Sequence, residues 1–204
     1  MKQKQQVVHI HGGNAFNSEK EFLSYLENID LWHMEDSEFN PWYKNYSANL
    51  KDDKYELLLI PMPNKENASY RSWKIWFERH VKFMRDEIIL VGHSLGGIFL
   101  AKYLSENILP VKIKQLHLVA AVYDFEDDTE QLNDFKISNF PGKFLENQIP
   151  EIHIYHSKDD TVVPISESKK YHAQIPGSHF HVFNDRSHFL DETFPELFEN
   201  IKRN

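Results

Sequence analysis

Six short apolar runs recur along the chain, and most are separated by segments in which apolar residues repeat every three or four positions. The runs are rich in β-branched and aromatic residues and predict buried strands, whereas the spacing between them predicts helices. Such alternation is typical of a mostly parallel sheet with helices on both faces, so the predicted fold class is α/β. The predicted strands are residues 7–10, 55–60, 88–91, 116–122, 152–155 and 180–183.

The helical segments carry several local signals of where helices begin and end. Ser18 is followed by Glu21, the spacing of a capping box. Pro195 fits the first turn of the last predicted helix, where its missing N–H is not needed. Residues 124–148 are acidic at first and then contain Asn-Phe-Pro-Gly, so this segment is predicted as a loop with at most short helices. The predicted helices are residues 18–29, 42–50, 70–84, 95–108, 166–175 and 191–201.

Length and composition limit the class of protein. The 204 residues fit a continuous core, so residues 1–204 are treated as a single domain. No apolar run approaches the roughly 20 residues that span a bilayer, and the first run is too short for a secretory signal, so we expect no membrane span and a cytoplasmic location. The net charge of −8 argues against nucleic acid as a partner, because phosphate binding relies on clustered lysines and arginines. The lack of cysteine excludes disulfides and thiolate metal sites.

The third predicted strand runs into Gly-His-Ser-Leu-Gly-Gly at residues 92–97, directly before a predicted helix. Gly-x-Ser-x-Gly between a strand and a helix predicts a nucleophile elbow, a tight turn that presents the serine, here Ser94, at the carboxyl edge of the sheet. The two outer glycines of the motif leave room for this strained turn. The N–H of Leu95 at the helix start would then be one donor to an oxyanion. The alternative is a glycine-rich turn in which Ser94 only caps the helix.

A serine hydroxyl becomes a strong nucleophile only when a base accepts its proton and a third group orients that base. The fifth predicted strand is followed by a polar turn with two adjacent carboxylates, Asp159 and Asp160. Either could face the site, and the spacing to the following Val-Pro favours Asp160. Among the twelve histidines, only His188 follows both serine and acid on a loop between a strand and a helix. The candidate triad is therefore Ser94, Asp160 and His188, whereas His93 is expected to pack locally.

A second donor to the oxyanion should come from the loop after the first strand, where residues 11–14 read His-Gly-Gly-Asn. The N–H of Gly13 is our candidate, and the alternative is a glycine turn that only ends the strand. Candidate substrate contacts are Asn14, which follows these glycines, and the aromatic residues Phe16, Trp42 and Tyr123, which could line an apolar pocket. Aromatic residues in such places are more often part of the core.

These motifs together resemble the α/β-hydrolase superfamily, in particular the compact serine hydrolases related to the retinoblastoma-binding serine hydrolase and its bacterial relatives. The resemblance also rests on Pro-Met-Pro-Asn at 61–64 and on residues 157–164 and 187–189, and it spans nearly the whole chain. It implies a three-layer fold with a six-stranded sheet, without extra antiparallel strands at the N-terminus and without a large cap domain. It also implies ester hydrolysis with no cofactor, and we expect no metal ion.

The predicted function is hydrolysis of a small carboxylic ester, with a thioester or an amide as alternative substrates. A rival from another class is a protein that keeps the hydrolase fold and binds a protein partner through its surface. The many histidines also suggest a metal-dependent hydrolase, but the chain lacks His-Glu-x-x-His. Compared with its compact relatives the chain has extra residues between 17 and 39. Residues 18–38 could form a small lid over the serine, or the helix at 18–29 could pack on the edge of the sheet.

Overall fold

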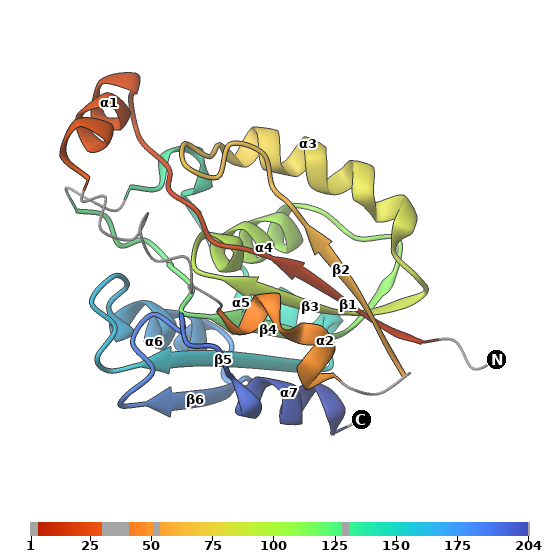
Figure 1. Ribbon diagram of the computed structural model, residues 1–204. Helices are drawn as coiled ribbons and strands as arrows, with labels where there is room; N and C mark the ends of the chain where they lie inside the picture. The colour runs from red at the N-terminus through yellow and green to blue at the C-terminus, as the bar shows by residue number, and fades with distance from the viewer. Residues whose placement is uncertain (1–3, 30–40, 51–53, 128–130, 204) are drawn as a thin grey trace.

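The centre of the computed structural model, which describes residues 4–29, 41–50, 54–127 and 131–203, is a sheet of six parallel strands (Figure 1). The strand order is β2-β1-β3-β4-β5-β6. All six predicted strands are present, and the helices on both faces confirm the predicted α/β class. The strands are β1 (Gln5–Ile10), β2 (Tyr55–Ile60), β3 (Glu87–His93), β4 (Lys112–Val119), β5 (Glu151–Ser157) and β6 (His179–Phe183).

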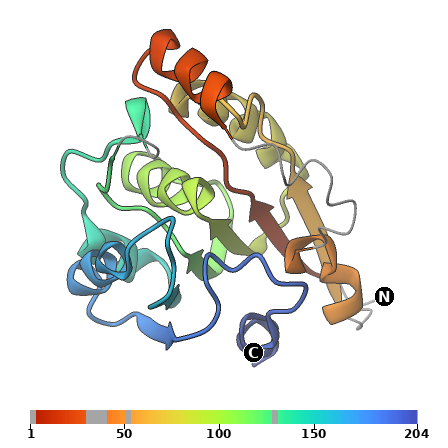
Figure 2. The same ribbon diagram turned by 60° about the vertical axis from the view of Figure 1, so that its left-hand side comes forward.

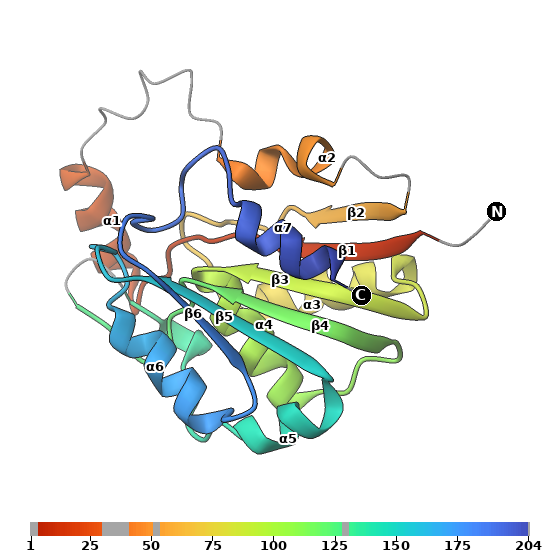
Figure 3. The same ribbon diagram turned by 90° about the horizontal axis from the view of Figure 1, so that it is seen from below.

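Figure 3 shows helices on both faces of the sheet. One face carries α3 (Tyr70–His80), α4 (Leu95–Glu106), α5 (Gly142–Gln148) and α6 (Ile165–Gln174), and the other carries α2 (Tyr46–Asn49) and α7 (Pro195–Lys202). Short 3-10 helices are η2 (Trp42–Lys44), η3 (Val81–Phe83) and η4 (Asn133–Phe135). Within the described ranges, none of the helices is both long and apolar enough to cross a membrane, and no large cap domain covers the sheet.

Each face of the sheet has its own apolar core, because side chains alternate between the two faces of a strand. Leu90 packs with Ile98 of α4 on one face, and Val91 packs with Leu197 of α7 on the other. Since both faces are covered, β3 is buried at every position after its first residue. The result is a rigid central strand that ends at the turn carrying Ser94.

Two predicted helices differ in extent from the observed ones. Residues 42–50 form η2 and a single turn, α2, because Asn45 between them has φ of −106° and ψ of 20° and is not helical. The helix predicted from residue 191 begins at Pro195, which occupies the first turn, where a missing N–H leaves no hydrogen bond unmade. Residues 124–148 contain η4 and α5 and otherwise no regular helix in their described part, as predicted.

The strand β4 is displaced towards the N-terminus relative to the prediction of residues 116–122. It begins at Lys112, and its first three residues are exposed or half-buried, with the polar Lys112 and Lys114 on either side of Ile113. It ends at Val119, because Ala120 takes a positive φ of 45° and turns the chain out of the sheet. A polar strand start of this kind carries no continuous apolar signal.

The strand order reverses beside β1, which lies between β2 and β3. After β1 the chain forms β2 on one side of it and then returns to form β3 on the other side, from which β4 to β6 continue. Ligands of open parallel sheets bind beyond the carboxyl ends of the strands at such a switch point. The loop at residues 11–14 follows β1 and Ser94 follows β3, so the fold brings these two segments together.

Candidate active site

Ser94 lies in the turn between β3 and α4 with φ of 53° and ψ of −121°, a strained conformation that typically costs about 1–3 kcal/mol. Flanking glycines permit the turn. A Cβ on Gly92 would lie 2.6 Å from the carbonyl oxygen of Gly96, and a Cβ on Gly96 would lie 2.3 Å from that of Ile10. Although Ser94 precedes α4, its side chain makes no capping hydrogen bond within the described chain. This geometry favours a nucleophile over a helix cap.

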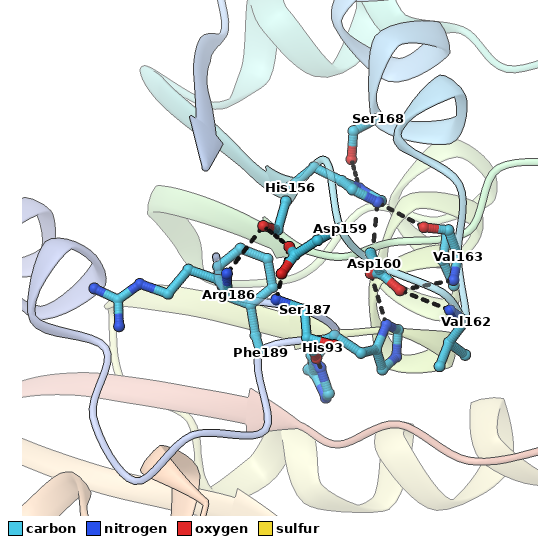
Figure 4. A network of polar contacts seen from close by, with 12 residues as sticks. His93, His156, Asp159, Asp160, Val162, Val163, Ser168, Arg186, Ser187 and Phe189 are labelled. Carbon is cyan, nitrogen blue, oxygen red and sulfur yellow. Dashed lines mark hydrogen bonds and ion pairs between the residues drawn. The ribbon is translucent and has the colours of Figure 1, made fainter. Parts of the chain in front are cut away.

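His188 and Asp160 meet across the loops that follow β6 and β5. The His188 Nδ1 lies 2.8 Å from Asp160 Oδ2, and the carboxyl group is fully buried. Asp160 Oδ1 accepts hydrogen bonds from the backbone N–H groups of Val162 and Val163, each at 2.9 Å (Figure 4). These bonds fix the carboxylate, so His188 donates its Nδ1–H to it and keeps Nε2 as the basic nitrogen. Of the two carboxylates after β5, only Asp160 makes this contact.

On the solvent side, Asp159 links the loops that follow β5 and β6 by hydrogen bonds. The sequence did not indicate this role. Its carboxylate accepts hydrogen bonds from the Ser157 hydroxyl and, at 3.0 Å, from the N–H of Ser187. The Ser157 Oγ in turn accepts the N–H of Arg186 at 3.0 Å (Figure 4). The Ser157 hydrogen bond lowers the pKa of Asp159, which keeps the acceptor charged. These contacts hold the two residues that precede His188.

His93 supports the same loop from inside the protein. Its Nε2–H donates to the carbonyl oxygen of His188 at 2.9 Å, and the two rings are 5.0 Å apart. Burial lowers the pKa of His93 to about 3, so the ring is neutral and holds one proton for this bond. His93 was expected only to pack locally, but it also contacts His188, which lies 95 positions further along the chain. His188 is thus held through its side chain by Asp160 and through its backbone by His93.

A cavity of about 910 Å³ opens at the carboxyl ends of the strands and is lined by both Ser94 and His188. The loop after β1 forms one wall, and a Cβ on Gly12 would lie 3.1 Å from the Cβ of Ser94. Other lining residues are Gly13, Asn14, Tyr43, Met62, Val162 and Leu190. The cavity thus joins the candidate nucleophile and base to a surface that a small ligand could contact.

Gly13 lines the same cavity as Ser94, and its backbone is tightly confined. A Cβ there would lie 2.5 Å from the carbonyl oxygen of Lys65, which also accepts the N–H of Asn14 at 2.7 Å. His11 braces the loop by accepting the N–H of Met62 on Nε2 at 2.9 Å. The roles of the Gly13 and Leu95 N–H groups as oxyanion donors remain predictions.

The four candidate substrate contacts lie in different places. Asn14 lines the cavity, and its Nδ2 donates to the hydroxyl of Tyr25 at 3.0 Å. The three aromatic residues are not among the cavity-lining residues. Trp42 is fully buried and donates its Nε1–H to the carbonyl oxygen of Phe189 at 2.8 Å, so it supports the loop that carries the base. Phe16 packs against Tyr25, and Tyr123 packs against the core on the face of the sheet that carries α4.

The sequence did not single out Tyr43 and Leu190, which line the cavity. Tyr43 is the immediate neighbour of Trp42, and only the path of the chain decides which of two adjacent aromatic residues faces a cavity. Met62 also lines it and belongs to the Pro-Met-Pro-Asn stretch on which the family resemblance rests.

The helix α1 (Glu19–Asn28) lies beyond the carboxyl end of β1 and buries none of its residues (Figures 1 and 2). Ser18 caps its start: the Ser18 hydroxyl accepts the N–H of Glu21 at 3.2 Å and donates to the Glu21 carboxylate at 2.7 Å. The link between Tyr25 and Asn14 connects α1 to the cavity wall. Residues 30–38 of the predicted lid lie outside the described residues, and the lid stays a prediction.

Comparisons with known proteins agree with this geometry. A family model described as serine hydrolase matches residues 33–201. The putative hydrolase YdeN of Bacillus subtilis strain 168 is 25% identical over 162 residues, which cover 79% of this chain and 85% of the relative. The crystal structure of the ydeN gene product from B. subtilis matches with a TM-score of 0.77 at 21% identity, over 97% of both chains. The esterase EaEST from Exiguobacterium antarcticum matches with a TM-score of 0.57 at 17% identity, over 98% of this chain and 91% of that one.

Proposed function

Because the chain belongs to the serine hydrolase family, we propose that it hydrolyses small carboxylic esters through a triad of Ser94, His188 and Asp160. The observation that carries the proposal is the pairing of a strained serine turn with a buried histidine–aspartate pair on one cavity. Backbone strain of about 1–3 kcal/mol brings no benefit to a turn with a purely structural role. In a nucleophile elbow, the same strained turn presents the serine hydroxyl to the substrate.

In the proposed first step, the Nε2 of His188 accepts the hydroxyl proton of Ser94 as Oγ attacks the ester carbonyl. The N–H groups of Leu95 and Gly13 stabilise the oxyanion, and the loss of one such donor typically lowers the rate about 100- to 1000-fold. His188 then gives its proton to the leaving alcohol, and an acyl-enzyme forms. A water molecule, deprotonated by His188, releases the acid in the second half of the reaction.

Asp160 stabilises the histidine cation that forms in each half of the reaction. Its burial makes the ion pair effective, because no water lies between the fully buried carboxyl group and Nδ1 at 2.8 Å. The two backbone N–H groups that bond the other oxygen hold the carboxylate in the orientation that faces His188.

The cavity wall favours a small, largely apolar acyl group. Leu59, Met62, Val162 and Leu190 supply apolar surface, and Asn14 supplies a polar contact beside the glycine loop. Esters are the substrate class we propose, since an alcohol leaves more readily than an amine; thioesters and amides are the alternative substrate classes. The proposed lid, in which α1 borders the acyl site, rests on the contact between Tyr25 and Asn14.

The decisive experiment combines covalent labelling with turnover. A fluorophosphonate probe should label the wild type and not Ser94→Ala, and p-nitrophenyl esters of increasing acyl length should be hydrolysed by the wild type alone. Ser105→Ala is the matched control, because Ser105 lies on the same helix α4 and its hydroxyl donates to the carbonyl oxygen of Lys102. A folded wild type that neither reacts with the probe nor hydrolyses any ester would refute the proposal and favour a binding protein on a hydrolase fold.

A further inference from the structure

Three imidazoles from neighbouring strands lie side by side on one face of the sheet. His117, His153 and His179 are paired in register across β4, β5 and β6. The centroids of neighbouring rings are 4.8 Å apart in both pairs, with interplanar angles of 9° and 28°. The series runs from two buried rings to an exposed one on the edge strand. Solvent therefore reaches one end of this series of rings.

Glu151 adds a carboxylate to the outer part of the series. It lies two residues before His153 and hence on the same face of β5, with its Oε1 2.8 Å from His153 Nε2. Glu151, His153 and His179 each offer one potential ligand atom, and these atoms all lie within 4.8 Å of one another. No other group of this kind occurs in the described part of the chain.

We propose that Glu151, His153 and His179 bind a divalent transition-metal ion of the zinc type. Two imidazole nitrogens and a carboxylate oxygen suit Zn²⁺, whose bonds of about 2.0–2.2 Å place neighbouring ligand atoms roughly 3.3–3.6 Å apart. On metal binding, the 2.8 Å separation between Glu151 Oε1 and His153 Nε2 must increase slightly, and the widest separation among the three ligand atoms must decrease. His179 is exposed and can rotate to do so, and water completes the coordination.

A neighbouring imidazole can orient one of the proposed ligands. His181 Nε2 lies 2.9 Å from His153 Nδ1, which suits a hydrogen bond that orients a metal-bound ring. When Nε2 binds the metal, His153 carries its proton on Nδ1 and donates it to His181, which holds its own proton on its other nitrogen.

The charged groups near the site partly balance one another. The carboxylates of Glu151 on β5 and Glu196 on α7 favour a cation, whereas Arg203 at the end of α7 opposes it. The whole chain carries a net charge of −8, which also favours cation binding. The site is separate from the cavity that contains Ser94, because none of its three ligands lines that cavity. A bound ion would join the edge strand β6 to β5.

The test uses the tag-free full-length chain, freed of metal with a chelator and titrated with Zn²⁺ by calorimetry at pH 7.5. One ion should bind per chain, and His179→Ala and Glu151→Gln should each weaken binding at least about tenfold. His80→Ala is the matched control, since His80 lies on α3 on the opposite face of the sheet and bonds only the carbonyl oxygen of Trp76 among the described polar partners. His153 is left intact, because a substitution at this buried position could unfold the chain.

Two further measurements separate a site from a change in folding. The melting temperature of the wild type should rise on adding Zn²⁺, and that of His179→Ala should not, while the metal-free variants should melt as the wild type does. Co²⁺ should give visible absorption bands in the wild type that are lost in the variant. The absence of saturable Zn²⁺ binding, or an unchanged affinity in either ligand variant, would overturn the proposal.

Discussion

Replacement of His93 by phenylalanine tests whether this buried ring, next to the proposed nucleophile Ser94, positions the proposed base His188. The change keeps the ring volume and removes the Nε2–H that donates to the carbonyl oxygen of His188 at 2.9 Å. A buried acceptor left without a partner costs about 1–3 kcal/mol. If His188 shifts to relieve this cost, the same free energy appears in the barrier, and kcat for ester hydrolysis falls about 5- to 150-fold with little change in KM.

The assay compares kcat, KM and the free energy of unfolding in three variants. His93→Gln retains an N–H at a similar reach and should recover most of the lost rate. His117→Phe is the matched control, because His117 is also buried and hydrogen-bonded but lies away from the cavity; it should lose stability and keep kcat. If His93→Phe keeps the wild-type kcat, or if His93→Gln is no better than His93→Phe, the positioning role is refuted.

Three other predictions follow from the same loops and histidines. Asp160→Asn keeps the shape of the side chain and removes its charge, so kcat should fall by about 10⁴ in the ester assay. Asp159→Ala should lower kcat by freeing the N–H of Ser187, and Asp159→Asn, which keeps an acceptor, should restore it. Burial lowers the pKa of His93 and His117, so the unfolded chain binds more protons below pH 6.5 and unfolding becomes easier as the pH falls. Since the pKa of His93 is about 3 in the folded chain, His93 contributes up to about 1.4 kcal/mol per pH unit between about pH 4 and 6. Urea titrations of His117→Phe should show a weaker dependence of the unfolding free energy on pH than those of the wild type.

The sequence predicted the elements and the candidate nucleophile because both depend on local signals. The turn at Ser94 needs a strand before it, a helix after it and glycines that avoid contacts below 3 Å, and all three are encoded within about 15 residues. The order of acid and base along the chain likewise follows from strand ends that meet at one edge of a parallel sheet. The sequence could therefore also suggest the pair of His188 and Asp160, whose Nδ1 and Oδ2 atoms lie 2.8 Å apart.

The supporting contacts could not be predicted, since they depend on which loops meet. The bond from His93 to the backbone of His188 joins residues 95 positions apart, and Asp159 reaches a loop 28 positions away. The aromatic residues near the site show the same limit. Trp42 and Tyr43 are adjacent and similarly apolar, yet only Tyr43 of the two lines the cavity while Trp42 is fully buried. Hydrophobicity alone does not decide between a core and a cavity wall.

His188 is held in place by residues that follow or end three strands, β3, β5 and β6. The loop after β6 follows an edge strand that is only partly buried, and both Ser187 and Phe189 have a positive φ, so the loop has little regular structure of its own. Asp159 and Asp160 restrain it from the end of β5, and His93 restrains it from the end of β3. Because the candidate base follows the edge strand and the candidate nucleophile follows a central strand, we expect these cross-loop hydrogen bonds to hold His188 in place relative to Ser94.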